Sequence, residues 1–175
     1  MIFVTVGTHE QSFDRIVKAI DALKQKNMIS QEVFIQTGYS SYRPRYCDHS
    51  DFIGFNRMIE QMQAADIVIT HGGTGSIMLA LYNQKIPVVM PRQKKYNEHI
   101  DDHQVHFCKK MESKGKIIAA YEVEDLEPAV SNYSQRVKEL QKQGDEQEVG
   151  HLNERAGRFA RELNEICTQL VKKNK

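Results

Sequence analysis

The stretch ITHGGTGSIMLALYNQKIPVVMPRQ, residues 69–93, decides the fold. One mostly apolar run, 66–73, ends in two glycines, and a second covers 86–91. Short continuous apolar runs of this kind are typical of strands that are buried on both faces of a parallel sheet. The stretch between them, 76–85, has helical character and connects the two runs as a right-handed crossover would. The segment therefore predicts a β-α-β unit.

The same alternation extends along the chain in both directions. Strands are predicted at 2–7, 33–38, 51–55, 66–73, 86–91 and 116–121. Helices are predicted at 12–27, 56–65, 76–85, 97–115, 123–143 and 151–175, with a loop at 144–150. Ser12 is expected to be the N-cap of the first helix, and Pro128 is expected in the first turn of the fifth.

Alternation of buried strands with helices predicts an α/β fold with a Rossmann-like, doubly wound parallel sheet. The length of 175 residues suits one domain with its own core. We expect a single domain over 1–175, with the sheet and its helices in 1–125 and C-terminal helices in 126–175.

The composition argues against several classes of protein. Lys and Arg number 24 against 23 Asp and Glu, and no zinc-finger spacing or aromatic RNA-binding motif is present, so nucleic acid is not expected as a partner. The cysteines Cys47, Cys108 and Cys167 are far apart and form no C-x-x-C motif, which favours a reducing cytoplasm over a disulfide framework. The N-terminus lacks the features of a signal peptide, and no run approaches the roughly 18 apolar residues of a membrane span.

Four glycine-rich or polar segments fall where predicted strands end. They are 7–9 (Gly-Thr-His), 38–41, 71–76 (His-Gly-Gly-Thr-Gly-Ser) and the stretch after Pro91. Because the carboxyl ends of parallel strands meet at one edge of an open sheet, where ligands bind, we expect these segments to form one site.

The glycine-rich segment 72–75 precedes a predicted helix. A helix start presents unpaired N–H groups and a positive dipole end, which suit phosphate oxygens, and glycine allows a ligand close to the backbone. Thr74 and Ser76 can add hydroxyl donors. The segment is not a Walker loop, because no G-K-[ST] follows, and the dinucleotide fingerprint G-x-G-x-x-G is absent. Taken alone, it leaves open both close backbone packing and anion binding.

The segment PRQKKYNEHIDDHQ, 91–104, concentrates charged and imidazole side chains. Within the predicted helix, Glu98 with Asp102 and His99 with His103 form i,i+4 pairs. The H-E-x-x-H order of a metal site is absent, so no metal is expected and a set of donors and acceptors for a sugar and a diphosphate fits better. A solvated helix start, or carboxylates paired with basic neighbours, are the alternatives.

The residues give no indication of covalent catalysis. A G-x-S-x-G nucleophile elbow is absent, and no cysteine lies beside an evident base in the sequence.

Four segments together resemble the C-terminal domain of glycosyltransferase family 28. They are FVTVGTHEQSFDRIVKAI, ADIVITHGGTGSIMLAL, KIPVVMPRQ and EHIDDHQ, and the resemblance covers roughly residues 1–125. Within the family the chain is most similar to small catalytic subunits of split enzymes, above all the bacterial galactosyl- or glucuronosyltransferase subunits of exopolysaccharide and capsule synthesis.

The resemblance implies the C-terminal, donor-binding half of a GT-B enzyme. Such an enzyme moves a hexose or hexuronic acid from a UDP-sugar with inversion, and it needs no metal or other cofactor. The missing half would be a membrane-anchored glycosyltransferase subunit that binds a polyprenyl-diphosphate-linked saccharide as the acceptor. The chain would then lie in the cytoplasm at the inner face of the membrane, held there by that partner.

The resemblance also implies roles for individual residues. The residues expected to bind the donor nucleotide sugar are Gly7, Thr8, Gly38, His71, Gly72, Gly73, Thr74, Gly75, Ser76, Arg92, Gln93, Glu98, His99, His103 and Gln104. His9 is the best candidate for a catalytic base within this chain, and a structural or donor-contact role is the alternative for it. The base of GT-B enzymes often comes from the acceptor half. Several family members hold the nucleotide ribose with a glutamate after the glycine loop, where this chain has Met78-Leu79-Ala80.

Two other functions are compatible with the same residues. One is a nucleotide-sugar-binding module without turnover of its own. The other is a nucleotide-sugar epimerase, which shares the GT-B fold but normally has both domains in one chain, whereas 175 residues suit only one.

Overall fold

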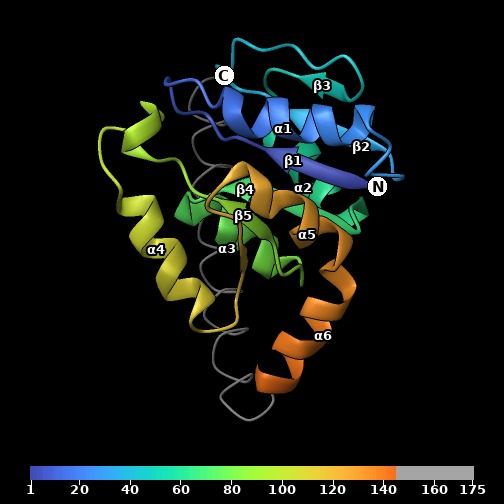
Figure 1. Cartoon of the computed structure of the whole chain (residues 1–175), viewed down its shortest axis with the longest axis vertical. Helices are drawn as coiled ribbons and strands as arrows, with labels where there is room; N and C mark the ends of the chain where they lie inside the picture. Colours follow the sequence, from blue (N-terminus) through green and yellow to red (C-terminus); the bar gives the residue numbers. More distant parts are fainter. Residues whose placement is uncertain (145–175) are drawn as a thin grey trace, which may run out of the picture.

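The described part of the chain is built around one parallel β-sheet. The structure is a computed structural model and describes residues 1–144. The strands are β1 Ile2–Thr5, β2 Val33–Gln36, β3 Asp48–Ser50, β4 Ile67–His71, β5 Val88–Met90 and β6 Ile118–Ala119. They pair in parallel in the order β3-β2-β1-β4-β5-β6 (Figure 1). This is the strand order of a Rossmann fold, and it confirms the predicted fold class.

Helices cover both faces of the sheet. The α-helices are α1 Asp14–Gln25, α2 Phe55–Ala64, α3 Thr74–Tyr82, α4 His103–Glu112, α5 Leu126–Ser131 and α6 Tyr133–Gly144. Short 3₁₀-helices are η1 Lys94–Tyr96 and η2 Val123–Asp125. Helices α1 and α5 pack on one face of the sheet, and α2, α3 and α4 pack on the other (Figure 1).

Successive strand residues point into opposite layers of the core. In β1, Ile2 and Val4 pack in the layer of α1 and α5, whereas Phe3 packs in the layer of α2 and α3. All three side chains are fully buried. Burial on both faces is the physical reason that the strands appear in the sequence as continuous apolar runs instead of alternating ones.

The direction in which the chain adds strands to the sheet reverses between β1 and β4, and this reversal marks where a ligand site is expected. From β1 the chain passes to α1 on one face of the sheet, and from the neighbouring β4 it passes to α3 on the other face. The loops after β1 and β4 therefore diverge at the carboxyl edge of the sheet. Ligands of open α/β sheets bind at such a switch point.

Two local predictions near β3 and α1 were wrong. The third strand is Asp48–Ser50 and not 51–55, because the chain turns after Ser50 and α2 begins at Phe55. Ser12 does not cap α1: its hydroxyl donates to the Asp14 carboxylate (2.7 Å), and no side chain bonds to the first amides of this helix. The helix begins one residue later than predicted, with Phe13 at the N-cap position, so Ser12 lies outside that position.

The predicted helix at 97–115 was wrong in its first six residues. Helix α4 begins only at His103, and Asn97 has a left-handed φ of 56°. The Asp102 carboxylate accepts a backbone N–H of η1 (2.8 Å), and the Asp101 carboxylate accepts the N–H of His103 (3.1 Å). Side-chain bonds of this kind satisfy backbone groups without a helix, so they end helical structure locally.

The C-terminal part was predicted only coarsely. The helix predicted at 123–143 is divided into η2, α5 and α6, with a break at Asn132, while Pro128 does lie in the first turn of α5. The helix predicted at 151–175 lies outside the described residues.

The Asp21 carboxylate of α1 fixes the loop that follows β2. It accepts hydrogen bonds from the backbone N–H groups of Arg45 (3.0 Å) and Tyr46 (2.8 Å) and from the Tyr42 hydroxyl (2.7 Å). Burial raises the pKa of Asp21, but these bonds together outweigh burial and hold its pKa below the ordinary 3.8. Asp21 therefore stabilises this loop in its ionised form.

Replacing Asp21 should remove a stability contribution that is sensitive to acid. Because the folded pKa lies below the unfolded one, the contribution is complete above the unfolded value of 3.8 and is lost as pH falls through the folded pKa. Urea unfolding should show that Asp21→Asn is less stable than wild type at neutral pH, with the gap shrinking by about pH 3. Asp48→Asn, exposed on β3, is the matched control and should follow the wild type. A gap that does not change with pH would contradict the assignment.

Candidate functional site

The glycine-rich segment forms the turn from β4 into α3. β4 ends at His71, Gly73 is the N-cap of α3, and the first helical bond runs from the N–H of Ile77 to the Gly73 carbonyl (3.1 Å). The N–H groups of residues 74–76 therefore have no acceptor within the helix, and no side chain caps them. Thr74 and Gly75 are exposed. The start of α3 thus presents free amides and a positive dipole end at the carboxyl edge.

The His71 ring requires two glycines as neighbours. A Cβ atom at Gly73 would lie 2.2 Å from Nε2 of His71, and one at Gly7 would lie 2.5 Å from its Cε1. Burial and the nearby Arg92 charge lower the pKa of His71 to about 4, so the ring is neutral at physiological pH. Gly7 and Gly73 therefore have a packing role, whatever binds at the turn.

The other two glycines of this segment differ from each other. A Cβ atom at Gly72 would meet Cβ of Gln104 at 2.9 Å and Sγ of Cys108 at 3.0 Å, so Gly72 permits α4 to pack closely. At Gly75 a Cβ atom would meet nothing within 4 Å. Packing explains Gly72 but not Gly75, which leaves the backbone of α3 open to an approaching ligand.

A buried polar network shapes the loop after β1. The Thr5 hydroxyl donates to Oε1 of Gln36 (2.6 Å), and Nε2 of Gln36 donates to the Gly7 carbonyl (3.1 Å). Gly7 has a φ of +77° and Gly38 a φ of +55°, and a Cβ at Gly38 would lie 2.6 Å from the Gly7 carbonyl oxygen. The absence of a side chain at Gly38 therefore allows the β1 loop to pack directly against it. Thr8, on the same loop, is exposed.

His9 follows on the same loop as a neutral hydrogen-bond donor. Burial lowers its pKa, and the charges of Arg92 and His99 lower it further. Its Nδ1 accepts the N–H of Gln11 (3.1 Å), so the proton of the neutral ring resides on Nε2. In this arrangement the free nitrogen of His9 donates a hydrogen bond, which suits an anion better than it suits the removal of a proton.

Arg92 is completely buried at the end of the β5 segment. Its guanidinium donates to the carbonyl oxygens of Val6 (3.0 Å), Gln11 (2.7 Å), Ser12 (3.4 Å) and Glu98 (3.1 Å). It also lies over the Phe13 ring, 4.8 Å from the centroid. The guanidinium thus ties the β1 loop to the segment before α4 and does not face solvent.

Three further predicted site residues are buried beside Arg92. Glu98 pairs in a bidentate manner with Arg15, at 2.8 and 2.9 Å, and accepts the N–H of Gln93 (3.1 Å). The Gln93 amide donates to the Tyr121 carbonyl, and Oε1 of Gln104 accepts the N–H of Arg92 (3.1 Å). The alternative in which a carboxylate pairs with a basic neighbour therefore describes Glu98, and its partner, Arg15, was missed because it lies far away in the sequence.

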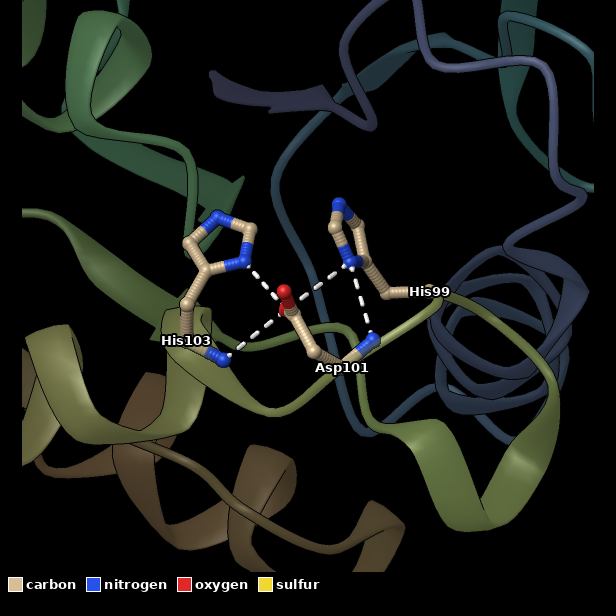
Figure 2. A group of neighbouring side chains, drawn as sticks. All are labelled: His99, Asp101 and His103. Carbon is tan, nitrogen blue, oxygen red and sulfur yellow. Dashed lines mark hydrogen bonds and ion pairs between the residues drawn. The ribbon is translucent and has the colours of Figure 1, made fainter.

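His99 and His103 meet around an acid that the sequence analysis did not select. Asp101 Oδ1 lies 3.2 Å from Nδ1 of His99 and 2.5 Å from Nδ1 of His103, and Figure 2 shows the two rings on either side of the carboxylate. The His9 ring also packs against His99, with centroids 4.6 Å apart. The sequence does contain the pattern H-x-D-x-H over 99–103. In the helix that was wrongly predicted there, the Asp101 side chain would have pointed away from the two histidines.

The predicted residues thus divide into an exposed set and a supporting set. The exposed or partly exposed members lie on the β1 loop, the α3 start and the histidine cluster: Gly7, Thr8, His9, His71, Gly73, Thr74, Gly75, Ser76, His99 and His103. The buried members are Gly38, Gly72, Arg92, Gln93, Glu98 and Gln104. The α3 turn Met78-Leu79-Ala80 carries no acid, and α3 as a whole has none.

Comparison with protein families gives a clear result. Residues 1–162 match the glycosyltransferase family 28 C-terminal domain. The chain belongs to this family. A search among curated proteins found none that matches.

Solved glycosyltransferase structures share the fold of this family 28 domain. The calicheamicin glycosyltransferase CalG4 superposes with a TM-score of 0.56 at 16% identity over 98% of this chain. The glycotransferase of kitacinnamycin gives 0.51 at 16% identity, and SnogD from Streptomyces nogalater gives 0.50 at 15%, each over 91% of the chain. The chain spans 42–43% of the length of these structures. At such low identity the likeness concerns the fold alone.

Replacing Arg92 by lysine should destabilise the protein although the charge is kept. A lysine has one compact ammonium group and cannot reach four carbonyl oxygens on two segments, so buried acceptors lose their donors. We expect the free energy of unfolding in urea to fall by roughly 2–4 kcal/mol. Arg43→Lys, at an exposed ion pair with Asp51, should cost less than about 1 kcal/mol. Equal losses in both variants would contradict this role of Arg92.

Proposed function

We propose that this family 28 domain is the donor-binding half of a glycosyltransferase and that it binds a nucleotide sugar, specifically a UDP-sugar, at the start of α3. The observation that carries the proposal is the open backbone at Gly75, beside amides without helical partners, at the switch point of the sheet. A diphosphate is the anion that fits several amides and a dipole end together. Family membership supports the same ligand class.

The chemistry then follows from where negative charge develops. In sugar transfer the bond from the anomeric carbon to the diphosphate breaks, and charge grows on the leaving phosphate oxygens. The amides of residues 74–76 and the hydroxyls of Thr74 and Ser76 would stabilise that charge. The Nε2–H of His9 adds a neutral donor on the neighbouring loop. We propose transfer of a hexose or hexuronic acid with inversion, and no step in it requires a metal ion or cofactor.

The acceptor side is proposed to come from another polypeptide. His9 has its Nδ1 lone pair engaged by Gln11, so the base that accepts the proton of the attacking hydroxyl is better placed on the acceptor half. Among the described residues no helix is long and apolar enough to cross a membrane. We propose a membrane-anchored partner subunit that binds a polyprenyl-diphosphate-linked saccharide in exopolysaccharide or capsule synthesis and holds this chain at the inner face of the membrane.

A nucleotide-sugar-binding module without turnover is the second proposal. It is favoured by the same engagement of His9, because that residue is then better suited to donate a hydrogen bond to a ligand than to accept a proton from an acceptor. The two functions share the donor site and differ only in whether a partner completes it.

Release of UDP separates the two proposals. The full chain is mixed with a panel of UDP-sugars, alone and with a membrane fraction that contains the acceptor-binding subunit, and free UDP is measured. We expect release only in the complete mixture. Binding without release in any mixture would favour the module, and failure of every UDP-, GDP- and dTDP-sugar to raise the melting temperature would overturn the donor site.

A valine at Gly75 should block donor binding without unfolding the protein. Its side chain would occupy the space beside the α3 amides. Apart from the neighbouring residues and the backbone of α3 itself, a Cβ atom at this position meets nothing within 4 Å. We expect calorimetry to show at least about a tenfold rise in the Kd for the UDP-sugar, with the free energy of unfolding changed by less than about 0.5 kcal/mol.

The matched control for this test is Gly54→Val. Gly54 is the N-cap of α2, and a Cβ atom there also meets nothing within 4 Å, but α2 follows the edge strand β3. It should bind the donor as the wild type does. Unchanged affinity in Gly75→Val would remove the α3 start from the donor site.

A further inference from the structure

We propose that His99, Asp101 and His103 form a binding site for one divalent transition-metal ion, with Zn²⁺ as the reference ion. One nitrogen from each histidine and one carboxylate oxygen of Asp101 all lie within 4.8 Å of one another. Figure 2 shows the two imidazole rings turned toward the same carboxylate. The metal proposal does not rest on the proposed donor site, although His99 and His103 were also predicted to contact the donor. Among the described residues, none of the three side chains forms a hydrogen bond with the α3 amides.

The spacing of the three groups suits an ion with bonds of about 2.0–2.2 Å, whose tetrahedral ligands lie roughly 3.3–3.6 Å apart. Nδ1 of His99 and Oδ1 of Asp101 are already 3.2 Å apart. Nδ1 of His103 is nearer, at 2.5 Å, and its side chain is 57% exposed, so the ring can withdraw without disturbing the core. A modest change in one exposed side chain therefore completes the geometry.

The contact between His99 and Asp101 has room for a bound cation. Nδ1 of His99 lies 3.2 Å from Oδ1 of Asp101, so either a proton on the ring nitrogen or a metal ion can lie between the two atoms. A metal ion bound there takes the place of that proton, because an imidazole nitrogen must be unprotonated to bind a metal.

Local structure holds the carboxylate in place for this task. Asp101 Oδ1 accepts the backbone N–H of His103 (3.1 Å), which fixes the carboxylate at the start of α4. His99 is mostly buried and packs against the His9 ring. Asp101 and His103 are exposed, so an ion can enter from solvent. One ligand is thus held rigidly by packing and two remain accessible.

The donor atoms select the kind of metal. Two imidazole nitrogens and one carboxylate oxygen suit Zn²⁺, Co²⁺, Ni²⁺ or Cu²⁺, whereas Mg²⁺ and Ca²⁺ prefer oxygen ligands alone. Three protein ligands leave a coordination position for water or another small ligand. Through His99 the ion would stiffen the contact with His9, which links the site to the loop after β1.

Metal binding can be measured directly on the full chain, without a tag and without nucleotide. Titration with Co²⁺ should produce the visible absorption of a low-symmetry site with one ion per chain, and Zn²⁺ should displace it in calorimetry. Mg²⁺ should produce no heat of binding. Asp101→Asn and His103→Ala should each weaken binding of Co²⁺ by at least about tenfold. Both positions are exposed, so circular dichroism should show unchanged folding.

His106→Ala is the matched control, because His106 is an exposed histidine one turn further along α4. It should bind Co²⁺ as tightly as the wild type. The proposal is overturned if the wild type gives no Co²⁺ spectrum, or if Asp101→Asn and His103→Ala bind as the wild type does, or if His106→Ala loses as much affinity as they do. None of these outcomes depends on nucleotide-sugar binding, so this test and the donor test fail separately.

Discussion

The burial of one guanidinium group, that of Arg92, is the constraint on which the rest of the site depends. A fully buried cation is costly unless its donors are used. Here the two terminal nitrogens of Arg92 donate to four carbonyl oxygens from two loops, and only the buried Nε has no partner among the described residues. Burial lowers the pKa of Arg92 to about 10, with the nearby Glu98 charge opposing that shift, so the group stays charged at neutral pH. The loops after β1 and β5 can take this form only together. The bidentate ion pair between Glu98 and Arg15 adds a second link, from the segment after β5 to helix α1.

The same charge sets the electrostatic character of the carboxyl edge. After burial itself, Arg92 is the largest influence that lowers the pKa of His71 and of His9, so both rings are neutral near pH 7. The carboxyl edge therefore combines a buried positive charge behind the loops with neutral imidazole rings and the unpaired amides at the start of α3. These features favour negative charge at this edge although the formal net charge of the whole chain is only +1.

The sheet could be predicted from the sequence because its signal is local. Continuous apolar runs identified the strands around β1, β2, β4 and β5, of which the first three end in glycine, and helical periodicity identified the crossovers. The edge strand β3 was misplaced because Asp48–Ser50 is polar and has one neighbour only, so burial leaves no pattern there. The helix expected at 97–102 failed because carboxylates of Asp101 and Asp102 satisfy backbone amides, which is a competition that periodicity does not detect.

The site was predicted as a location more accurately than as a set of contacts. Residues near the strand ends do converge, but whether a polar side chain faces solvent or braces a loop depends on partners far away in the sequence. Glu98 was predicted to contact the sugar or diphosphate. In the structure both of its carboxylate oxygens accept hydrogen bonds from Arg15, which lies 83 positions earlier in the sequence. Asp101 was not selected from the sequence, and only the folded loop places it between two imidazoles. The glycines show the same distinction, since Gly72 and Gly73 are explained by the side chains they admit and Gly75 is not. Because Gly75 also lies beside the unpaired amides of α3, its open surroundings indicate this turn as the place where a ligand would approach the backbone.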